Sequence, residues 1–211
     1  HMVEKMITPY IHNMFSTYHA ALTKLETGLD ERFEQSVNVI SQTGQHVIIC
    51  GMGKSGLVGR KIAATLSSTG TAALFLHPAE AIHGDLGMVR EKSVVIVISP
   101  SGETEEVVKL LPALRGLDTK IIALVGSLDS TLAKASNIVL DASIDKEACP
   151  LNLAPTTSTL TTLVMGDALA IALMNRSGFK PEDFAANHPG GMLGMRLLSR
   201  VNDRMVQKER P

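Results

Sequence analysis

The chain has 211 residues, of which 45% are hydrophobic but only 3% aromatic, and its formal net charge at pH 7 is −1. That length suits a single domain with an aliphatic core, and the near-neutral charge excludes the broad basic surface that nucleic-acid binding needs. No uninterrupted apolar run reaches the roughly 18 residues of a membrane-spanning helix, and the sequence has no secretory signal pattern. We therefore expect a cytoplasmic protein with neither a nucleic-acid nor a membrane partner.

The N-terminal segment is predicted to be helical from about residue 3 to residue 44. The preceding His1–Met2 pair is interpreted as an expression remnant and set aside. Val37 and Ile40 recur at helical spacing, and Gly28–Asp30 marks a break between two helices. A long amphipathic helix ahead of the first strand either packs on a partner subunit or covers its own sheet, and the sequence leaves both possibilities open.

Five apolar stretches rich in β-branched residues predict the strands of a sheet, at residues 47–50, 72–76, 93–98, 120–125 and 137–140. Helical patterns lie at 57–68, 104–117, 130–135 and 158–175. Strands that alternate with helices and are apolar on both faces predict an α/β fold, a three-layer sandwich around a mostly parallel five-stranded sheet, flavodoxin-like or Rossmann-like. We expect one domain, in which an α/β core at 45–200 includes short C-terminal helices that begin at Pro181 and Leu193, and 201–211 forms a polar, frayed tail.

The first predicted strand ends in Gly51–Met52–Gly53–Lys54–Ser55–Gly56, and helix-forming residues follow. Such a turn aims backbone N–H groups and the positive end of a helix at one point, which favours anion binding. The spacing matches the dinucleotide motif G-x-G-x-x-G, but the second strand ends on His77–Pro78 instead of the acid that would hold a ribose. A P-loop would need a glycine where Ile48 stands. We therefore expect no nucleotide cofactor.

Two further hydroxyl-rich segments stand at predicted helix starts, Ser99–Thr104 after the third strand and Thr156–Thr159 before the long helix. Ordinary capping by Ser and Thr is the alternative explanation for each. The glycine turn after the first strand and the Ser99–Thr104 loop are two cradles of one design on neighbouring strands, which favours a ligand instead, and Thr156–Thr159 is a third candidate. Converging neutral donors suit a phosphate monoester that is held and released without a metal ion.

These motifs resemble the sugar isomerase (SIS) domain. Further stretches closely resemble the arabinose-5-phosphate isomerase family: His77–Ala81, His83–Gly87, Lys146–Pro150, Leu153–Thr156, Met165–Ala170 and His188–Gly191. The resemblance covers roughly residues 20–205 and implies interconversion of D-ribulose 5-phosphate and D-arabinose 5-phosphate, the first step toward the Kdo sugar of lipopolysaccharide and capsules. Many family members continue past Met205 into two CBS domains, so this chain is expected to be an isolated SIS domain or a natural short form.

The resemblance implies catalytic roles for Lys54, His83, Glu106 and His188, and no metal ion or other cofactor. It implies phosphate binding by Gly53, Ser55, Gly56, Ser99, Ser101, Gly102, Thr104, Thr156 and Ser158. Moving a proton between C1 and C2 through a cis-enediol needs a base and a group that polarises the carbonyl.

Each proposed catalytic residue also has a structural explanation. Taken alone, Glu106 is a first-turn acid favoured by the helix dipole, and His83 is a structural histidine. The resemblance instead makes Glu106 the base, His83 an acid or base in ring opening and Lys54 the group that neutralises enediolate or phosphate charge. It also implies that His188 reaches the site of a neighbouring subunit in a homotetramer.

Two other functions remain open on the sequence. A regulatory module that binds a sugar phosphate needs the cradles but not the four catalytic residues. An isomerase of another phosphosugar needs all of them, because spacing alone does not separate pentose from hexose or heptose.

Overall fold

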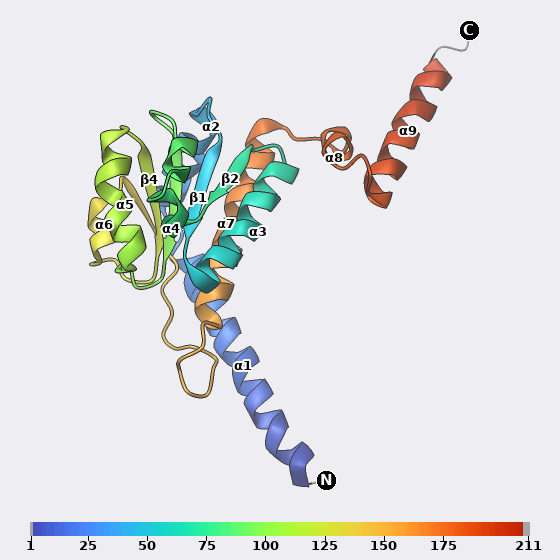
Figure 1. The fold of residues 1–211 in the computed structure, drawn as a ribbon. Helices are drawn as coiled ribbons and strands as arrows, with labels where there is room; N and C mark the ends of the chain where they lie inside the picture. The colour runs from blue at the N-terminus through green and yellow to red at the C-terminus, as the bar shows by residue number, and fades with distance from the viewer. Residues whose placement is uncertain (1, 209–211) are drawn as a thin grey trace.

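A five-stranded sheet lies at the centre of the computed structural model, which describes residues 2–208 (Figure 1). Its strands are β1 (Val47–Gly51), β2 (Ala73–Leu76), β3 (Val94–Ser99), β4 (Lys120–Val125) and β5 (Ile138–Asp141). They pair in the order β2–β1–β3–β4–β5, and every pair is parallel. The predicted α/β fold is confirmed, and the sheet is parallel throughout.

The strand order brings the ends of β1 and β3 together. From β1 the chain moves outward to β2, then returns across β1 to add β3, β4 and β5 on the other side. Such a reversal is a topological switch point, where the loops after two neighbouring strands diverge and leave a crevice. Gly51, the last residue of β1, pairs with Ile98 of β3, so the loops after both strands emerge at the same level.

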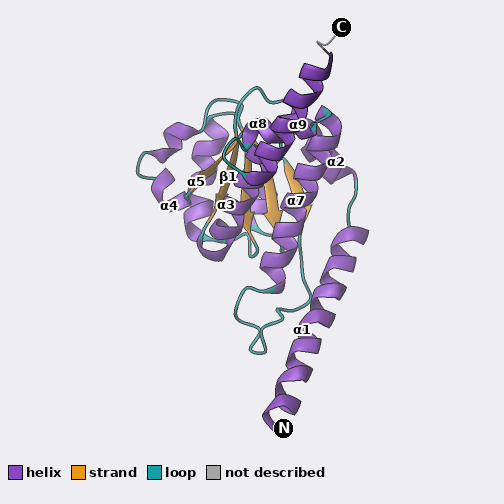
Figure 2. Ribbon diagram, turned by 90° about the vertical axis from the view of Figure 1, so that its right-hand side faces the viewer, coloured by secondary structure: helices purple, strands orange, loops and turns teal. Residues whose placement is uncertain are grey.

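Helices cover both faces of the sheet (Figures 1 and 2). One face carries α2 (Glu31–Gln42), α3 (Gly53–Ser68) and α7 (Thr157–Ser177), and the other carries α4 (Pro78–Ala81), α5 (Glu105–Gly116), α6 (Thr131–Ala135) and the 3₁₀ turn Asp85–Met88. Successive strand residues point to opposite faces, which divides the core into two clusters. Ile96 belongs to the cluster that contains Leu169 of α7, and Val95 to the one that contains Leu110 of α5.

The long helix α7 is the one helix of the described chain that is long and apolar enough to cross a membrane, by length and composition only. The sequence analysis predicted this helix at 158–175 but did not count it as long enough to cross a membrane, because polar residues interrupt its apolar run. Met165, Leu169 and Leu173 are buried against the sheet, as in a core helix. Gly166 allows α7 to approach α3 closely, since a Cβ there would lie 2.4 Å from Cγ1 of Ile62. We therefore interpret α7 as part of the core.

Two helical arms extend beyond the α/β body (Figures 1 and 2). The first is the N-terminal half of α1 (Met2–Thr27), whose C-terminal half packs on α7. The second consists of α8 (Pro181–Asn187) and α9 (Met192–Lys208). The predicted break near Gly28–Asp30 is confirmed, because α1 ends before it and α2 begins after it.

The predicted end of the last helix is wrong. The sequence analysis ended it at Ser199 and predicted a frayed tail from Val201, whereas α9 continues to Lys208. Arginine, glutamine and lysine are polar but are also good helix formers, so the polar composition of this segment did not indicate a helix end. The rest of the predicted tail, 209–211, lies outside the described residues.

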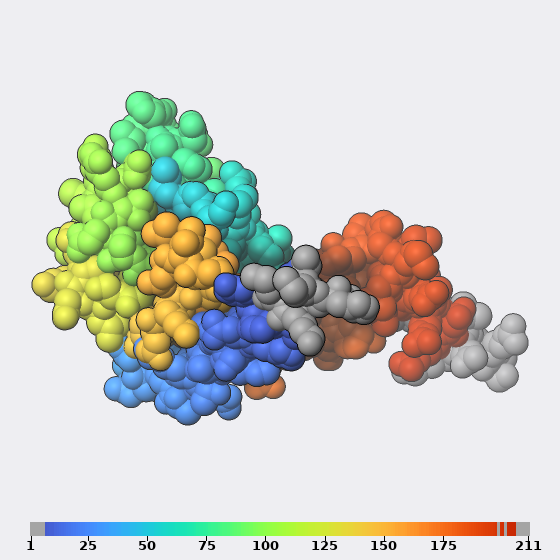
Figure 3. All heavy atoms as spheres, turned by 90° about the horizontal axis from the view of Figure 1, so that it is seen from below, coloured from blue at the N-terminus to red at the C-terminus, as the bar shows by residue number. Residues whose placement is uncertain are grey.

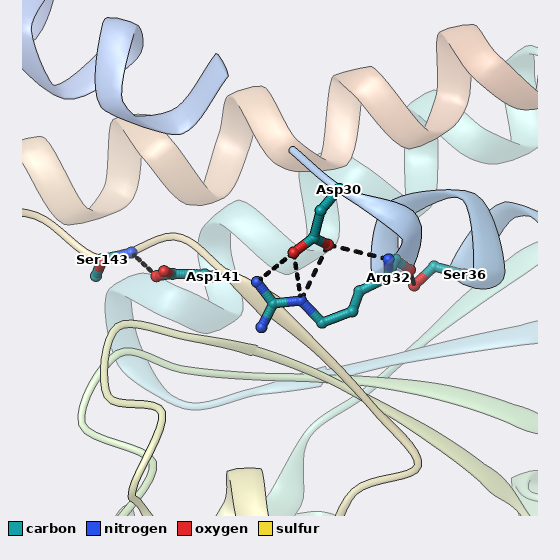
Figure 4. A network of polar contacts seen from close by, with 5 residues as sticks. All are labelled: Asp30, Arg32, Ser36, Asp141 and Ser143. Atoms are coloured by element: carbon teal, nitrogen blue, oxygen red, sulfur yellow. Dashed lines mark hydrogen bonds and ion pairs between the residues drawn. The ribbon is translucent and has the colours of Figure 1, made fainter. Parts of the chain in front are cut away.

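A small polar network lies where α2 begins near the end of β5 (Figure 4). Asp30 caps α2 by accepting a hydrogen bond from the Arg32 N–H at 3.0 Å. The Arg32 side chain hydrogen-bonds to the Asp30 carboxylate and lowers the pKa of Asp30. Nearby, Asp141 accepts a hydrogen bond from the N–H of Ser143 at 2.8 Å, which turns the chain from β5 into a long loop.

Candidate functional site

The turn between β1 and α3 is shaped by two glycines. Gly53 has φ +54°, in the region that favours glycine. A Cβ at Gly56 would lie 2.7 Å from the carbonyl oxygen of Gly51, so only glycine lets the helix start this close to the strand. No side chain caps this end of α3, which leaves its first N–H groups available to an anion. Lys54 is exposed and Ser55 half-buried in this first turn.

The loop after β3 is held by its own hydroxyl groups. The buried Ser99 Oγ lies 2.8 Å from Thr104 Oγ1 and accepts a hydrogen bond from the Gly102 N–H at 3.0 Å. Gly102 has φ +67°, and a Cβ there would lie 1.9 Å from Ser130 Oγ. The Leu132 N–H donates to the Gly102 carbonyl at 3.1 Å and joins the loop to α6. The side chains of Ser99 and Thr104 therefore stabilise the conformation of the loop itself.

A cavity of about 300 Å³ lies between these two loops and the start of α7. Its walls include four residues that the sequence analysis assigned to the site: Lys54, Ser55, Ser101 and Ser158. An adjacent hollow of about 170 Å³ shares Pro100, Ser158 and Thr162 with it and adds Glu147. Together they form a pocket of the size that small ligands occupy, at the switch point of the sheet.

The start of α7 differs from the open cradle that the sequence suggested. The Glu147 carboxylate accepts hydrogen bonds from the N–H of Thr156 at 2.6 Å, from Thr156 Oγ1 at 3.0 Å and from the N–H of Ser158 at 3.3 Å. Burial alone raises the pKa of Glu147, but the hydrogen bonds from Ser158 and Thr156 outweigh it and lower that pKa. The chain's own carboxylate therefore occupies the donors at this helix end.

Sequence reasoning gave no role to Glu147, the carboxylate on the pocket wall. It was quoted only as part of the Lys146–Pro150 stretch, and a single acid in a loop matches no spacing rule. What identifies it is its contact with a helix end nine or more residues further along the chain.

Three acids stand around the start of α5, and two of them are bound elsewhere. Glu103 accepts hydrogen bonds from the N–H and Oγ1 of Thr131, both at 2.7 Å, and caps α6. Glu105 forms an ion pair with Lys109 at 2.7 Å. Both acids therefore serve local structural contacts. Glu106 is half-buried and its carboxylate has no hydrogen bond within residues 2–208, but it does not line the pocket.

The two predicted catalytic histidines lie outside the pocket of their own chain. His83 is exposed on the segment between α4 and the 3₁₀ turn. His188 ends α8, where its ring stacks on Phe184 at 3.8 Å between centroids. The neighbouring Asn187 donates to the carbonyl of Ser68, the last residue of α3. Because the 16 residues of α3 span about 24 Å, His188 lies at the opposite end of that helix from Lys54.

A larger hollow, of about 520 Å³, lies at the other end of the sheet. It is lined by Val47 and Ala72 at the starts of β1 and β2, and by Arg176 from α7. Ligands of parallel α/β sheets bind beyond the carboxyl ends of the strands. The smaller pocket is therefore the candidate site.

The buried Cys50 is no candidate nucleophile, and no metal-binding cluster occurs among the described side chains. Within residues 2–208, no group of three or more His, Cys, Asp or Glu side chains could hold a metal ion. Cys50 lies at the end of β1, but burial raises the pKa of its thiol to about 12, so the thiolate is scarce near neutral pH.

Comparison with known proteins identifies similar sequences and structures. Residues 40–172 match the SIS domain. Arabinose 5-phosphate isomerase KpsF of Escherichia coli O6:H1 is 50% identical over 204 residues, 94% of this chain and 62% of that protein. Arabinose 5-phosphate isomerase KdsD of Pseudomonas aeruginosa is 52% identical over 185 residues, 88% of this chain and 57% of that protein. The chain thus spans about three-fifths of the length of these curated relatives.

Solved structures agree with these sequence matches. An E. coli CFT073 protein in complex with arabinose 5-phosphate superposes with a TM-score of 0.82 at 37% identity, covering 89% of this chain and 97% of that one. A phosphosugar isomerase from Bacteroides fragilis, described as involved in capsule formation, gives a TM-score of 0.82 at 34% identity, over 90% of this chain and 99% of that one.

Proposed function

The chain belongs to the SIS domain family, and we propose that it interconverts D-ribulose 5-phosphate and D-arabinose 5-phosphate through a cis-enediol. The observation that carries the proposal is the pocket at the β1–β3 switch point, where Lys54, Ser55, Ser101 and Ser158 converge. About half of the aligned residues are shared with proteins named arabinose 5-phosphate isomerases. That likeness supports the choice of a pentose phosphate over other phosphosugars.

The phosphate group is proposed to bind where the two glycine-shaped loops face each other. The uncapped first turn of α3 supplies N–H groups and the positive end of a helix. Ser55 and Ser101 add hydroxyl donors from the two sides of the cavity. The backbone shape of the two loops at the proposed phosphate site depends on Gly53, Gly56 and Gly102. The loop after β3 is also held by the internal hydrogen bonds of Ser99 and Thr104. Thr156 acts through Glu147, while Ser158 also lines the cavity.

Phosphate binding would fix the two carbons between which the proton moves. In the forward direction a base removes a proton from C1 of the ketose, and the enediol then receives a proton at C2 while the C1 hydroxyl becomes the aldehyde. We assign the base role to Glu106 on the family resemblance. Lys54 is the cation that stabilises the enediolate oxygen, and His83 is assigned to ring opening. Glu147 is a second carboxylate on the pocket wall.

The proposal includes assembly of several copies, because His188 lies too far from the pocket of its own chain to act there. We propose a homotetramer in which the α8–α9 arm of one copy brings His188 to the pocket of another. The reaction is assigned to the cytoplasm, where its product would enter synthesis of Kdo for lipopolysaccharide or capsule.

A direct test is incubation with ribulose 5-phosphate in D₂O, with the aldose product identified by NMR. We expect arabinose 5-phosphate that carries deuterium at C2, because the proton taken up by the base exchanges with solvent before a proton is returned to C2. Fructose 6-phosphate and sedoheptulose 7-phosphate serve as comparison ketoses and should turn over far more slowly. Binding of these sugars without turnover of any of them would contradict the proposed isomerase activity and would support a regulatory module that binds a sugar phosphate.

A further inference from the structure

The candidate pocket has two compartments of different electrostatic character. The larger, of about 300 Å³, contains the exposed Lys54 and lies at the uncapped start of α3. Among the described residues that line the smaller compartment, of about 170 Å³, only Glu147 is charged. Figure 3, which views the molecule from this end, shows the light-orange loop at 146–156 beside the cyan α3. A phosphate is therefore favoured in the larger compartment and disfavoured beside the carboxylate of the smaller one.

The smaller compartment suits the hydroxyl groups of a sugar. The Glu147 carboxylate stays charged at neutral pH, because the hydrogen bonds from Ser158 and Thr156 lower its pKa, and its oxygens can accept further hydrogen bonds. The Thr162 hydroxyl donates to the carbonyl of Ser158 at 2.8 Å, which leaves its oxygen as an acceptor. Sugar hydroxyls are donors for both groups, whereas a phosphate dianion is not.

Three residues border both compartments: Pro100, Ser158 and Thr162. A ligand that reaches from one compartment into the other therefore passes between the loop after β3 and the first turns of α7. Thr162 is buried and lies one helical turn beyond Ser158. Its side chain limits the width of this junction on the side of α7.

Both walls of the junction are held by hydrogen bonds to the ends of strands. The Pro100 carbonyl accepts a hydrogen bond from the Gly126 N–H at 2.9 Å, which fixes the loop to the end of β4. Thr161 Oγ1 donates to the carbonyl of Ala142 at 2.9 Å and ties the start of α7 to the residue after β5. Closely packed walls resist the volume of even one additional methylene group.

We propose that Thr162 determines the chain length of the sugar phosphate that the pocket accepts. With the phosphate held in the larger compartment, C1 and C2 of a five-carbon sugar lie at the junction, on the side of Lys54. Each further carbon between the phosphate and C2 pushes these two atoms past Thr162 into the smaller compartment. The inference rests on the proposed site of phosphate binding and adds the residue that separates a pentose from a hexose or heptose.

Calorimetric binding of sugar-alcohol phosphates tests this limit without turnover. Arabinitol 5-phosphate and glucitol 6-phosphate are open chains that differ by one carbon, and both lack the carbonyl that isomerisation needs. We expect wild type to bind the five-carbon compound about tenfold more tightly, the lower end of the discrimination that one methylene gives in a pocket. Thr162→Ala should bring the two dissociation constants within about twofold of each other, because the smaller side chain widens the junction.

Two variants control for effects other than width. Thr162→Val keeps the shape of the side chain and loses only the hydroxyl, so it should retain the wild-type ratio of the two constants. Thr159→Ala makes the same truncation on the same helix, where the side chain lines only the larger compartment, and should also retain that ratio. Far-UV circular dichroism checks the fold of each variant. Should Thr162→Ala not fold, Thr162→Ser removes a single methyl group and should lower the ratio to about threefold.

Absent or equal binding of the two compounds by wild type would overturn the inference. An unchanged ratio in the folded Thr162 truncation, or the same loss of ratio in Thr159→Ala or Thr162→Val, would also overturn it. A wild type that shows the expected ratios but no turnover of ribulose 5-phosphate would contradict the proposed reaction alone. An active wild type whose ratio is indifferent to Thr162→Ala would contradict this inference alone.

Discussion

The α/β body and the two helical arms differ in how far their apolar side chains are covered by the rest of the chain. In the body, the inner strands β1, β3 and β4 are covered on both faces, and the loop after β3 is closed by internal bonds such as that between Ser99 and Thr104. In the arms, large apolar side chains such as Phe15 and Met192 remain exposed, and His188 stands far from the pocket. The body can hold a ligand alone, whereas the arms fit a role that involves another copy.

The largest expected effect is on the body. Replacing Lys54 with Ala should lower kcat/KM for ribulose 5-phosphate by about 10²–10³-fold, the scale of losing one charge-stabilising group. The thermal midpoint should stay at the wild-type value, because Lys54 is exposed and no hydrogen bond or ion pair holds it within residues 2–208. Steady-state kinetics and calorimetry measure the two quantities. Near wild-type turnover would remove Lys54 from the mechanism.

A mixing experiment tests whether the arm serves another copy. His188→Gln should lower turnover by about 10²-fold, the usual contribution of an acid–base group. Unfolding and refolding Lys54→Ala and His188→Gln together should restore activity well above either variant alone, since mixed assemblies contain pockets with both residues intact. Each variant refolded alone is the control. Activity that stays at the sum of the two would place His188 in its own chain's function.

Stability of the loop after β3 should depend on Gly102. The Gly102→Ala change combines a positive φ with an overlap on Ser130, and we expect a loss of about 2–4 kcal/mol in the free energy of unfolding. Gly116→Ala is the matched control, because no atom lies within 4 Å of the added Cβ. Urea titrations compare the two. Equal stability of both variants would contradict the rigid loop.

The smallest expected effect is the change in the free energy of unfolding when the Glu147 carboxylate at the start of α7 is removed. The pKa of Glu147 is lowered below its ordinary 4.5, so its stabilising contribution is present above that pH and is lost as pH falls through the lower folded value. Glu147→Gln should cost about 1 kcal/mol near neutral pH after solvent screening. The difference from wild type should shrink in urea titrations as the pH is lowered below 4.5. A difference independent of pH would contradict the charged contact.

The fold was predictable because buried parallel strands have a strong sequence signal. Residues 47–49, 94–98 and 121–125 are continuously aliphatic, and the strands predicted at 47–50, 93–98 and 120–125 agree with the observed ones within a residue at each end. Glycines with a required conformation, such as Gly53, marked the strand-to-helix turns.

The site was only partly predictable, because its remaining features depend on contacts between distant segments. No local pattern indicates that Glu147 fills the start of α7, or that Ser99 is turned into its loop. The distance of His188 from Lys54 follows from α8 packing at the far end of α3, which no spacing rule conveys. The length of α9 was underestimated because its polar C-terminal residues were interpreted as a frayed tail, although several of them are good helix formers.

The attachment of the Ser99–Thr104 loop to α6 has a consequence for binding thermodynamics. Three contacts join the loop to the start of α6. The Glu103 carboxylate accepts a hydrogen bond from Thr131, Gly102 packs closely against Ser130, and the Leu132 N–H donates to the Gly102 carbonyl. A segment already fixed in the free protein loses little conformational entropy when a ligand arrives. The affinity of this side of the pocket for a small anion should therefore reflect nearly the full strength of its hydrogen bonds.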